Sequence, residues 1–123
     1  MSCDVCLYAA DDVDNQFYSE TTRVARKPHQ CCECDQAIPV GATYQRAAGK
    51  SDGRMFVNKT CAICAEVRTV FYCGGSFYFT TLWEAMAEEA FELLTTASEC
   101  FRELSPAAKA AVLDRWARWK GLA

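Results

Sequence analysis

Two Cys-x-x-Cys pairs constrain the fold of this sequence more than any other feature. Cys31 and Cys34 form the first pair, Cys61 and Cys64 form the second, and residues 35–60 separate them. A tight turn lets two thiolates at this spacing reach one ion at about 2.3 Å, and a second pair completes a tetrahedral shell. The ion also closes a long loop that a small core would not hold alone. The pattern therefore predicts a structural zinc site with these four ligands.

Three other interpretations of the four cysteines stay open at this point. Unligated cysteines are common buried residues, although they seldom occur in such pairs. An iron–sulfur cluster also takes four thiolates. Redox chemistry at one Cys-x-x-Cys needs an exposed thiolate in a thioredoxin-like setting, and no such setting is visible in the sequence. We adopt zinc as the first interpretation.

The composition favours metal binding over a disulfide scaffold. The 123 residues include nine cysteines and one histidine, and 51% of them are hydrophobic. This fraction allows a modest core in one small domain. The first residues lack the basic-then-apolar order of a signal peptide, and no apolar run approaches the ~20 residues of a membrane span. We therefore expect a cytoplasmic protein with reduced cysteines and no membrane association.

The remaining cysteines offer a second metal site. Its three candidate ligands are Cys3, Cys6 and Cys73. The fourth ligand would be Cys32, His29 or Cys100. An ion there would join the N-terminal segment to the end of the helix that starts at Cys61. The alternative is that Cys73 and Cys100 are small core residues and the N-terminal pair is loosely ordered. Core packing is the favoured interpretation for Cys100, which lies on an apolar stripe.

Charge divides the chain into three regions. Residues 1–20 carry a net charge of −5, residues 21–69 a net charge of +4 and residues 70–123 a net charge of −2, which together make the overall −3. The middle region is therefore basic between two acidic ends. The basic residues that can form one face of this region, beside Tyr44 and Phe56, are Arg23, Arg26, Lys27, Arg46, Lys50, Arg54 and Lys59.

The middle region has the pattern of a hairpin followed by a helix. Residues 42–48 and 54–60 read as strands, with residues 49–53 as the connecting loop. From Cys61 the apolar residues recur at helical spacing. Cys73-Gly74-Gly75 is expected to end this helix, because glycine suits the left-handed cap.

The last third of the chain is predicted to be helical. Thr81 and Glu84 form a capping-box pattern, and an apolar stripe runs from Leu82 to Leu104. Ser105-Pro106 then starts a second helix as its N-cap and first residue. The apolar residues of that helix are Val112, Trp116 and Trp119. We expect the two helices to pack as an antiparallel hairpin.

These patterns predict a small α+β fold with three parts. An acidic N-terminal segment with a Cys-x-x-Cys pair covers residues 1–20, and a treble-clef zinc finger (knuckle, β-hairpin, helix) covers residues 21–75. An α-helical hairpin covers residues 76–123.

Residues around the two cysteine pairs carry a resemblance to a known family. They are Phe17-Tyr18-Ser19-Glu20, Arg23, Ala25-Arg26-Lys27, His29, Cys31, Glu33-Cys34, Ile38, Gly41, Tyr44, Gly49-Lys50, Asp52-Gly53, Phe56, Thr60-Cys61, Cys64 and Arg68. Over this part the sequence resembles small zinc-binding proteins encoded by bacteriophages and prophages. The resemblance implies a zinc-held fold, a phage origin and action in the cytoplasm of a bacterial host. It implies no activity, and it covers neither Cys32 nor the helical tail.

Enzyme activity is not expected. Nucleases built on treble clefs use a histidine base at the hairpin, whereas the single histidine here, His29, precedes the first cysteine. Zinc deaminases need a His-x-Glu motif and a Pro-Cys-x-x-Cys motif, and neither is present. Catalytic zinc also keeps an open coordination position, and four thiolates close the shell.

Three binding functions are then compared. The first is a protein-interaction module that inhibits a host factor or defence complex, as anti-CRISPR proteins do. The second is a nucleic-acid-binding regulator that uses the basic face, with Trp116 and Trp119 as further contacts. The third is an assembly role for an aromatic patch at residues 77–83. A host or phage protein is the expected partner, with nucleic acid as the alternative.

Overall fold

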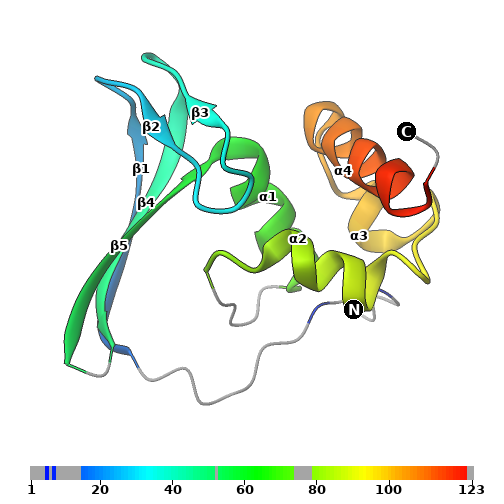
Figure 1. The fold of residues 1–123 in the computed structure, drawn as a ribbon, viewed down its shortest axis with the longest axis horizontal. Coiled ribbons are helices and arrows are strands. Elements are labelled where there is room, and N and C mark those ends of the chain that lie inside the picture. Colours follow the sequence, from blue (N-terminus) through cyan, green and yellow to red (C-terminus); the bar gives the residue numbers. More distant parts are fainter. Residues whose placement is uncertain (1–4, 6, 8–14, 52, 74–78, 122–123) are drawn as a thin grey trace.

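The computed structural model describes residues 5, 7, 15–51, 53–73 and 79–121, and these form a small α+β fold (Figure 1). The larger sheet contains three antiparallel strands in the order β1-β4-β5. These strands are β1 (Asn15–Val24), β4 (Thr43–Ser51) and β5 (Arg54–Cys61). A smaller sheet pairs β2 (His29–Gln30) with β3 (Ala37–Ile38).

The predicted hairpin of β4 and β5 is confirmed, but its loop is shorter than expected. Ser51 pairs with Arg54, so only two positions separate the strands. Gly53 has φ = 78°, a backbone conformation that tight hairpin turns use and that glycine adopts without a steric penalty. Residues 49–51, which were predicted as part of the loop, therefore extend β4.

Strand β1 was not predicted. It pairs with β4 from Asn15 opposite Ser51 to Val24 opposite Thr43, so the predicted boundary between residues 20 and 21 falls inside this strand. Residues 19–24 are all exposed. An edge strand exposed on both faces needs no alternation of apolar and polar residues, and that alternation is the signal by which strands are recognised.

Helix α1 (Ala62–Phe71) starts where the sequence predicts. The Cys61 side chain accepts the backbone N–H of Cys64 and so caps the helix. The helix ends at Phe71, and Cys73 takes the left-handed conformation with φ = 53°. The expected glycine terminator is therefore corrected in part: Cys73 makes the left-handed turn, and Gly74-Gly75 lie outside the described residues.

The prediction of one continuous helix after Thr81 is wrong. The chain forms short pieces instead: α2 (Leu82–Ala85), the π-helical turn η1 (Met86–Ala90) and α3 (Glu99–Arg102). The Thr81 side chain makes no capping hydrogen bond. Between η1 and α3, the Ser98 hydroxyl accepts the N–H of Thr95. Such local side-chain bonds compete with helical ones, which explains the interruption.

Helix α4 (Pro106–Trp119) follows the prediction more closely. Ser105 caps it by accepting the N–H of Ala108, and Pro106 occupies its first turn. The predicted hairpin of two long helices does not form, because its first helix is broken into short pieces. Helix α4 packs against α1 instead (Figure 1). On the other side of α1 lie strands β4 and β5. Helix α1 is thus the centre of the fold.

The core joins all these parts. It includes Val67 and Phe71 of α1, Met86 of η1 and Val112 of α4, each completely buried. Most of the predicted apolar stripe is buried even though its helix is broken. No helix among the described residues is both long enough and apolar enough to cross a membrane.

Candidate metal centre

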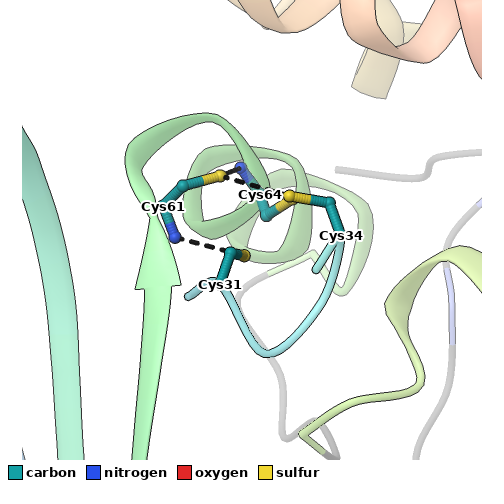
Figure 2. A group of neighbouring side chains, drawn as sticks. All are labelled: Cys31, Cys34, Cys61 and Cys64. Atoms are coloured by element: carbon teal, nitrogen blue, oxygen red, sulfur yellow. Dashed lines mark hydrogen bonds between the residues drawn. The ribbon is translucent and has the colours of Figure 1, made fainter. Parts of the chain in front are cut away.

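The four cysteines of the two Cys-x-x-Cys pairs lie together in the structure (Figure 2). The sulfur atoms of Cys31, Cys34, Cys61 and Cys64 all lie within 4.8 Å of one another. A tetrahedral ion with bonds of about 2.3 Å holds its sulfurs about 3.8 Å apart. A small contraction would therefore bring the four sulfurs onto one ion.

The first pair lies in the turn between β2 and β3. The N–H of Cys31 donates to the carbonyl of Gln36 at 2.9 Å, and the N–H of Asp35 donates back to the carbonyl of Cys31 at 3.0 Å. Asp35 has φ = 61°, which turns the chain sharply after Cys34. This tight turn directs both thiols to the same side.

The second pair lies where β5 meets α1. Cys61 is the last residue of β5, and Cys64 lies in the first turn of α1. Three residues along a helix nearly complete one turn, so the two side chains lie on the same face. The strand end and the helix start thus complete the group that the turn begins.

Backbone and indole N–H groups point at these sulfurs. Cys31 Sγ accepts the N–H of Glu33 at 3.4 Å and that of Cys61 at 3.3 Å. Cys64 Sγ accepts the indole N–H of Trp83 at 3.4 Å. Donors directed at sulfur stabilise the thiolate form and orient metal ligands. The surroundings of the group therefore suit negatively charged sulfur.

The pKa of the Cys31 thiol is shifted in the opposite direction from those of Cys61 and Cys64. Side-chain hydrogen bonds from Cys61 and then Cys64 hold the pKa of the Cys31 thiol well below its usual range. The hydrogen bond with Cys31 raises the pKa of Cys61 to about 11, and bonds with Cys31 and Cys61 raise the pKa of Cys64 further. The Cys31 thiolate is thus favoured, and its charge opposes ionisation of Cys61 and Cys64. A divalent cation removes this opposition.

A buried ion pair supports the turn that carries Cys31 and Cys34, which we call the knuckle. The sequence analysis did not predict this ion pair. Arg68 Nη1 lies 2.7 Å from Glu33 Oε2, and both side chains are almost inaccessible. The other Glu33 oxygen accepts the N–H of Leu82 at 3.1 Å, and Arg68 also donates to Gln45. The network joins the knuckle, α1, β4 and the start of α2. Its sequence signal was weak, since Glu33 and Arg68 lie 35 residues apart.

Two residues considered as fourth ligands lie outside the four-cysteine group. Cys32 Sγ contacts the Thr60 hydroxyl at 3.4 Å, and burial raises the pKa of this thiol. His29 stacks against Tyr44 at 5.1 Å between ring centroids, and its Nδ1 lies 3.2 Å from Lys59 Nζ. Desolvation, Lys59 and Lys27 lower the pKa of His29.

The second predicted site is described only in part. Cys73 and Cys100 have their sulfur atoms 3.7 Å apart, whereas Cys3 and Cys6 lie outside the described residues. Cys100 is 2% exposed and belongs to the hydrophobic core, which confirms the favoured interpretation of this residue.

One face of the large sheet gathers several of the predicted basic residues. Arg46 of β4 is opposite both Thr21 of β1 and Lys59 of β5, and residues opposite each other share a face. By alternation, Arg23 and Lys50 lie on this same face. Arg26 and Lys27 follow β1 and line, with Arg23, His29 and Tyr44, a hollow at the end of this face. We call these residues the basic face: Arg23, Arg26, Lys27, His29, Arg46, Lys50 and Lys59.

Other predicted contact residues lie elsewhere. Arg54 and Phe56 occupy the opposite face of the sheet, where Phe56 packs against Phe79 at 6.0 Å between ring centroids. Trp116 donates its indole N–H to the carbonyl of Phe91, and Trp119 also packs on Phe91. These tryptophans stabilise the helical region on the far side of α1 from the sheet.

The described part of the aromatic patch is also mostly internal, and Phe77 and Tyr78 lie outside the described residues. Leu82 and Trp83 are buried, and Phe79 packs between Phe56 and the Arg68 guanidinium.

In comparisons with protein-family models, curated proteins and solved structures, nothing matches this chain.

Proposed function

We propose that the four-cysteine group holds a structural zinc ion in a treble-clef arrangement, and that the protein acts by binding. The chain order of knuckle, β4-β5 hairpin and α1 supports the arrangement, with one cysteine pair in the knuckle and the other at the start of α1. Four thiolates suit zinc and leave no coordination position for water or substrate. The ion would therefore stabilise a surface and take no part in chemistry.

The partner that the surface fits best is a nucleic acid, bound on the basic face. The observation that carries this proposal is the gathering of cations from three strands on one side of the sheet. In the part of the chain that the structure describes, the ion pairs are Arg68–Glu33 and Arg118–Asp114, and neither involves this face. A row of cations that makes no ion pair with the described carboxylates favours a polyanion.

One pair on this face costs stability in the free protein. Arg46 and Lys59 lie directly opposite each other on neighbouring strands. Like charges in this position repel and destabilise a sheet. Lys59 also contacts His29, whose pKa is lowered by desolvation and by Lys59 and Lys27. Phosphate groups on this face would relieve the repulsion, so the arrangement is suited to the bound state.

The length of the face matches a nucleic-acid backbone. Arg46 and Lys50 are four residues apart on β4, which corresponds to about 13 Å along a strand. Duplex DNA carries one phosphate per roughly 1.7 Å of axis, so several phosphates lie within that length. Helices α3 and α4 lie on the other side of α1 from the sheet, so their acidic residues do not oppose this contact (Figure 1).

Fluorescence anisotropy with random-sequence DNA and RNA over a range of salt concentrations tests the proposal. The wild-type protein should bind at low salt and weaken steeply as salt rises. Combining Arg23→Gln, Arg46→Gln and Lys50→Gln should reduce the magnitude of the negative slope of log K against log salt by about 2–3, because each phosphate contact contributes about 0.9 to it.

A matched control removes the same charge from other exposed positions. Arg54→Gln, Arg102→Gln and Lys120→Gln lie outside the basic face and should leave the salt slope nearly unchanged. Absence of binding by the wild type at low salt contradicts the nucleic-acid proposal. An equal loss in both triple variants also contradicts it, because net charge alone would then explain binding.

A protein partner is the second candidate, and one observation favours it. Met55 and Val57 lie on the basic face toward the hairpin end and are 64% and 48% exposed. A basic surface with an apolar end fits an acidic protein surface. The phage resemblance directs the test to a bacterial lysate treated with nuclease. A protein captured by the wild type and lost with Met55→Ser and Val57→Ser supports this candidate; no enrichment over metal-stripped protein counts against it.

A further inference from the structure

The hollow at the end of the basic face has a lining that phosphate contacts alone do not explain. Its volume is about 820 Å³, within the range of roughly 300–1,000 Å³ that small-molecule sites have. Its lining consists of Arg23, Val24, Arg26, Lys27, His29 and Tyr44. Three cations thus share the hollow with two aromatic rings and with an apolar side chain that is 62% exposed. A ligand that uses the whole lining carries both an anionic group and a flat apolar ring.

Backbone hydrogen bonds hold the segment that carries two of the cations. Arg26 and Lys27 are exposed and follow the buried Ala25. The N–H of Ala25 donates to the carbonyl of Ala42 at 2.9 Å, and the carbonyl of Ala25 accepts the N–H of Gly41 at 2.9 Å. The two cations therefore extend from a backbone that is already ordered, which lowers the entropic cost of binding a ligand there.

The aromatic part of the lining is also held in place. The rings of His29 and Tyr44 lie 5.1 Å apart between centroids, and His29 Nδ1 lies 3.2 Å from Lys59 Nζ. Tyr44 is buried, whereas His29 is half-buried. His29 is thus the ring with surface left for a ligand, and its contacts with Tyr44 and Lys59 fix its position.

A cation lies beside these rings. Arg23 is directly opposite Tyr44 in the pairing of β1 with β4, so their side chains leave the sheet next to each other on the same face. Arg23 Nε donates to the Thr21 hydroxyl at 3.1 Å, a bond that orients the guanidinium and does not use its terminal nitrogens. Those nitrogens suit the oxygens of a phosphate. The hollow therefore combines phosphate donors with an aromatic surface, which is the combination that a nucleotide requires.

The same combination selects an unpaired nucleotide. Bases in a duplex are stacked on their neighbours, and a protein ring reaches the face of a base only where that base is unstacked. We propose that the hollow receives an unpaired nucleotide of a bound single strand, with its phosphate on the three cations and its base against His29. This inference rests on the proposed nucleic-acid function and specifies the substrate as single-stranded.

The rest of the basic face gives the strand a path beyond the hollow. Arg46 is two residues from Tyr44 along β4, and Lys50 is four residues further. At about 3.3 Å per residue, these cations lie about 7 and 20 Å along β4 from Tyr44. Neighbouring phosphates of a single strand would contact them, whereas a free mononucleotide would fill the hollow and leave them unused. A strand is therefore the preferred ligand.

Fluorescence anisotropy with a DNA strand free of self-complementarity, and with the duplex of the same sequence, tests the proposal. The wild type should bind the single strand at least about 5-fold more tightly than the duplex, since stacking of one base contributes a factor of about 5 to 150. The ratio should increase with salt, because phosphate contacts weaken as salt rises and stacking does not. Equal affinities across the salt range, or tighter binding of the duplex, overturn the proposal.

The ring at position 29 has matched variants. His29→Ala removes the ring and should bring the ratio of single-strand to duplex affinity to about 1. His29→Phe keeps an aromatic surface and should retain a preference for the single strand. A ratio that is unchanged in His29→Ala overturns the contact between the base and this ring.

Photocrosslinking covers the case in which the variants fold poorly, because it uses the wild type alone. A strand that contains iodouracil should crosslink within residues 23–44, the segment that contains every residue lining the hollow. Crosslinks found only outside this segment overturn the proposal.

The outcomes separate this inference from the function on which it rests. If the wild type binds neither form at low salt, the nucleic-acid function itself fails. If it binds both forms equally with a steep salt dependence, that function stands and the assignment to a single strand fails. Thymidine monophosphate should compete with the bound strand only weakly. Competition as strong as that of the unlabelled strand would assign the hollow to a free nucleotide and overturn the assignment to a strand.

Discussion

The two halves of this protein are stabilised by different forces. The sheet module (residues 15–73) has the four-cysteine group and the buried Arg68–Glu33 pair at its centre. The helical region (residues 79–121) buries an apolar stripe that includes Leu82, Met86 and Ala90. A sheet with one face open to solvent buries little apolar surface. The four-cysteine group and the buried ion pair therefore add to the apolar burial that α1 contributes to the sheet module, and a metal ion bound by the group would add further.

Two carboxylates connect these halves. Glu33 of the knuckle accepts the N–H of Leu82 at the start of α2. Glu66 of α1 accepts both the N–H and the hydroxyl of Ser105 at 2.6 and 2.7 Å, just before α4. These hydrogen bonds position the two halves relative to each other. Four changes test whether the two halves depend on different interactions.

Loss of the metal at the four-cysteine centre should have the largest effect. A structural zinc site contributes about 10–16 kcal/mol of apparent binding free energy in small zinc domains. Chelation or Cys31→Ser should abolish cooperative unfolding of the sheet module, followed by circular dichroism and hydrogen exchange. Cys32→Ser, one residue away, should retain it. Unchanged exchange in β4 and β5 after chelation would show that apolar packing suffices.

Arg68→Met should destabilise the protein by about 3–5 kcal/mol, because it leaves the Glu33 carboxylate buried without its cation. Adding Glu33→Gln should recover part of the loss, since the uncompensated charge is then removed. Urea denaturation measures both. The matched comparison is Arg118→Met, which breaks the exposed pair with Asp114 and should cost about 0–1 kcal/mol. Equal losses in the two arginine variants would contradict the assignment.

Met86→Ala should cost about 2–5 kcal/mol through the cavity it leaves in the helical region. Met86 is completely buried and is not a member of the four-cysteine group. The zinc content should therefore stay unchanged while the free energy of unfolding falls. Leu93→Ala, at a residue 61% exposed, is the control and should have little effect. Loss of zinc in Met86→Ala would show that the halves are not separable.

Glu66→Gln should have a smaller effect, about 1.5–3 kcal/mol, because it weakens two hydrogen bonds to a charged acceptor. The change acts on the junction between α1 and α4, so hydrogen exchange should rise at the first turn of α4 before it rises in the sheet. Glu103→Gln, at an exposed position, should leave exchange unchanged. A uniform rise across the chain would argue against a local junction.

Local patterns predicted the parts of the fold that are determined within a few residues. The four cysteines, the β4-β5 hairpin and the Ser105 cap each depend on short spacings, and the structure contains all three. The broken helix was mispredicted because the apolar stripe continues through residues 91–98 while the Ser98 hydroxyl bonds locally. Apolar periodicity records burial, and burial does not require an unbroken helix.

Contacts between distant segments could not be predicted in the same way. No spacing rule pairs Arg68 with Glu33 or Cys73 with Cys100, and nothing in the pattern of β1 distinguishes an exposed edge strand from a loop. Sequence alone specified a protein rich in paired cysteines, with spacing suited to a metal ion, and with a basic middle region. Tertiary structure decided which cysteines meet and which cations share a face. Those choices depend on how α1 brings the sheet and the helices together, and that packing is a property of the whole chain.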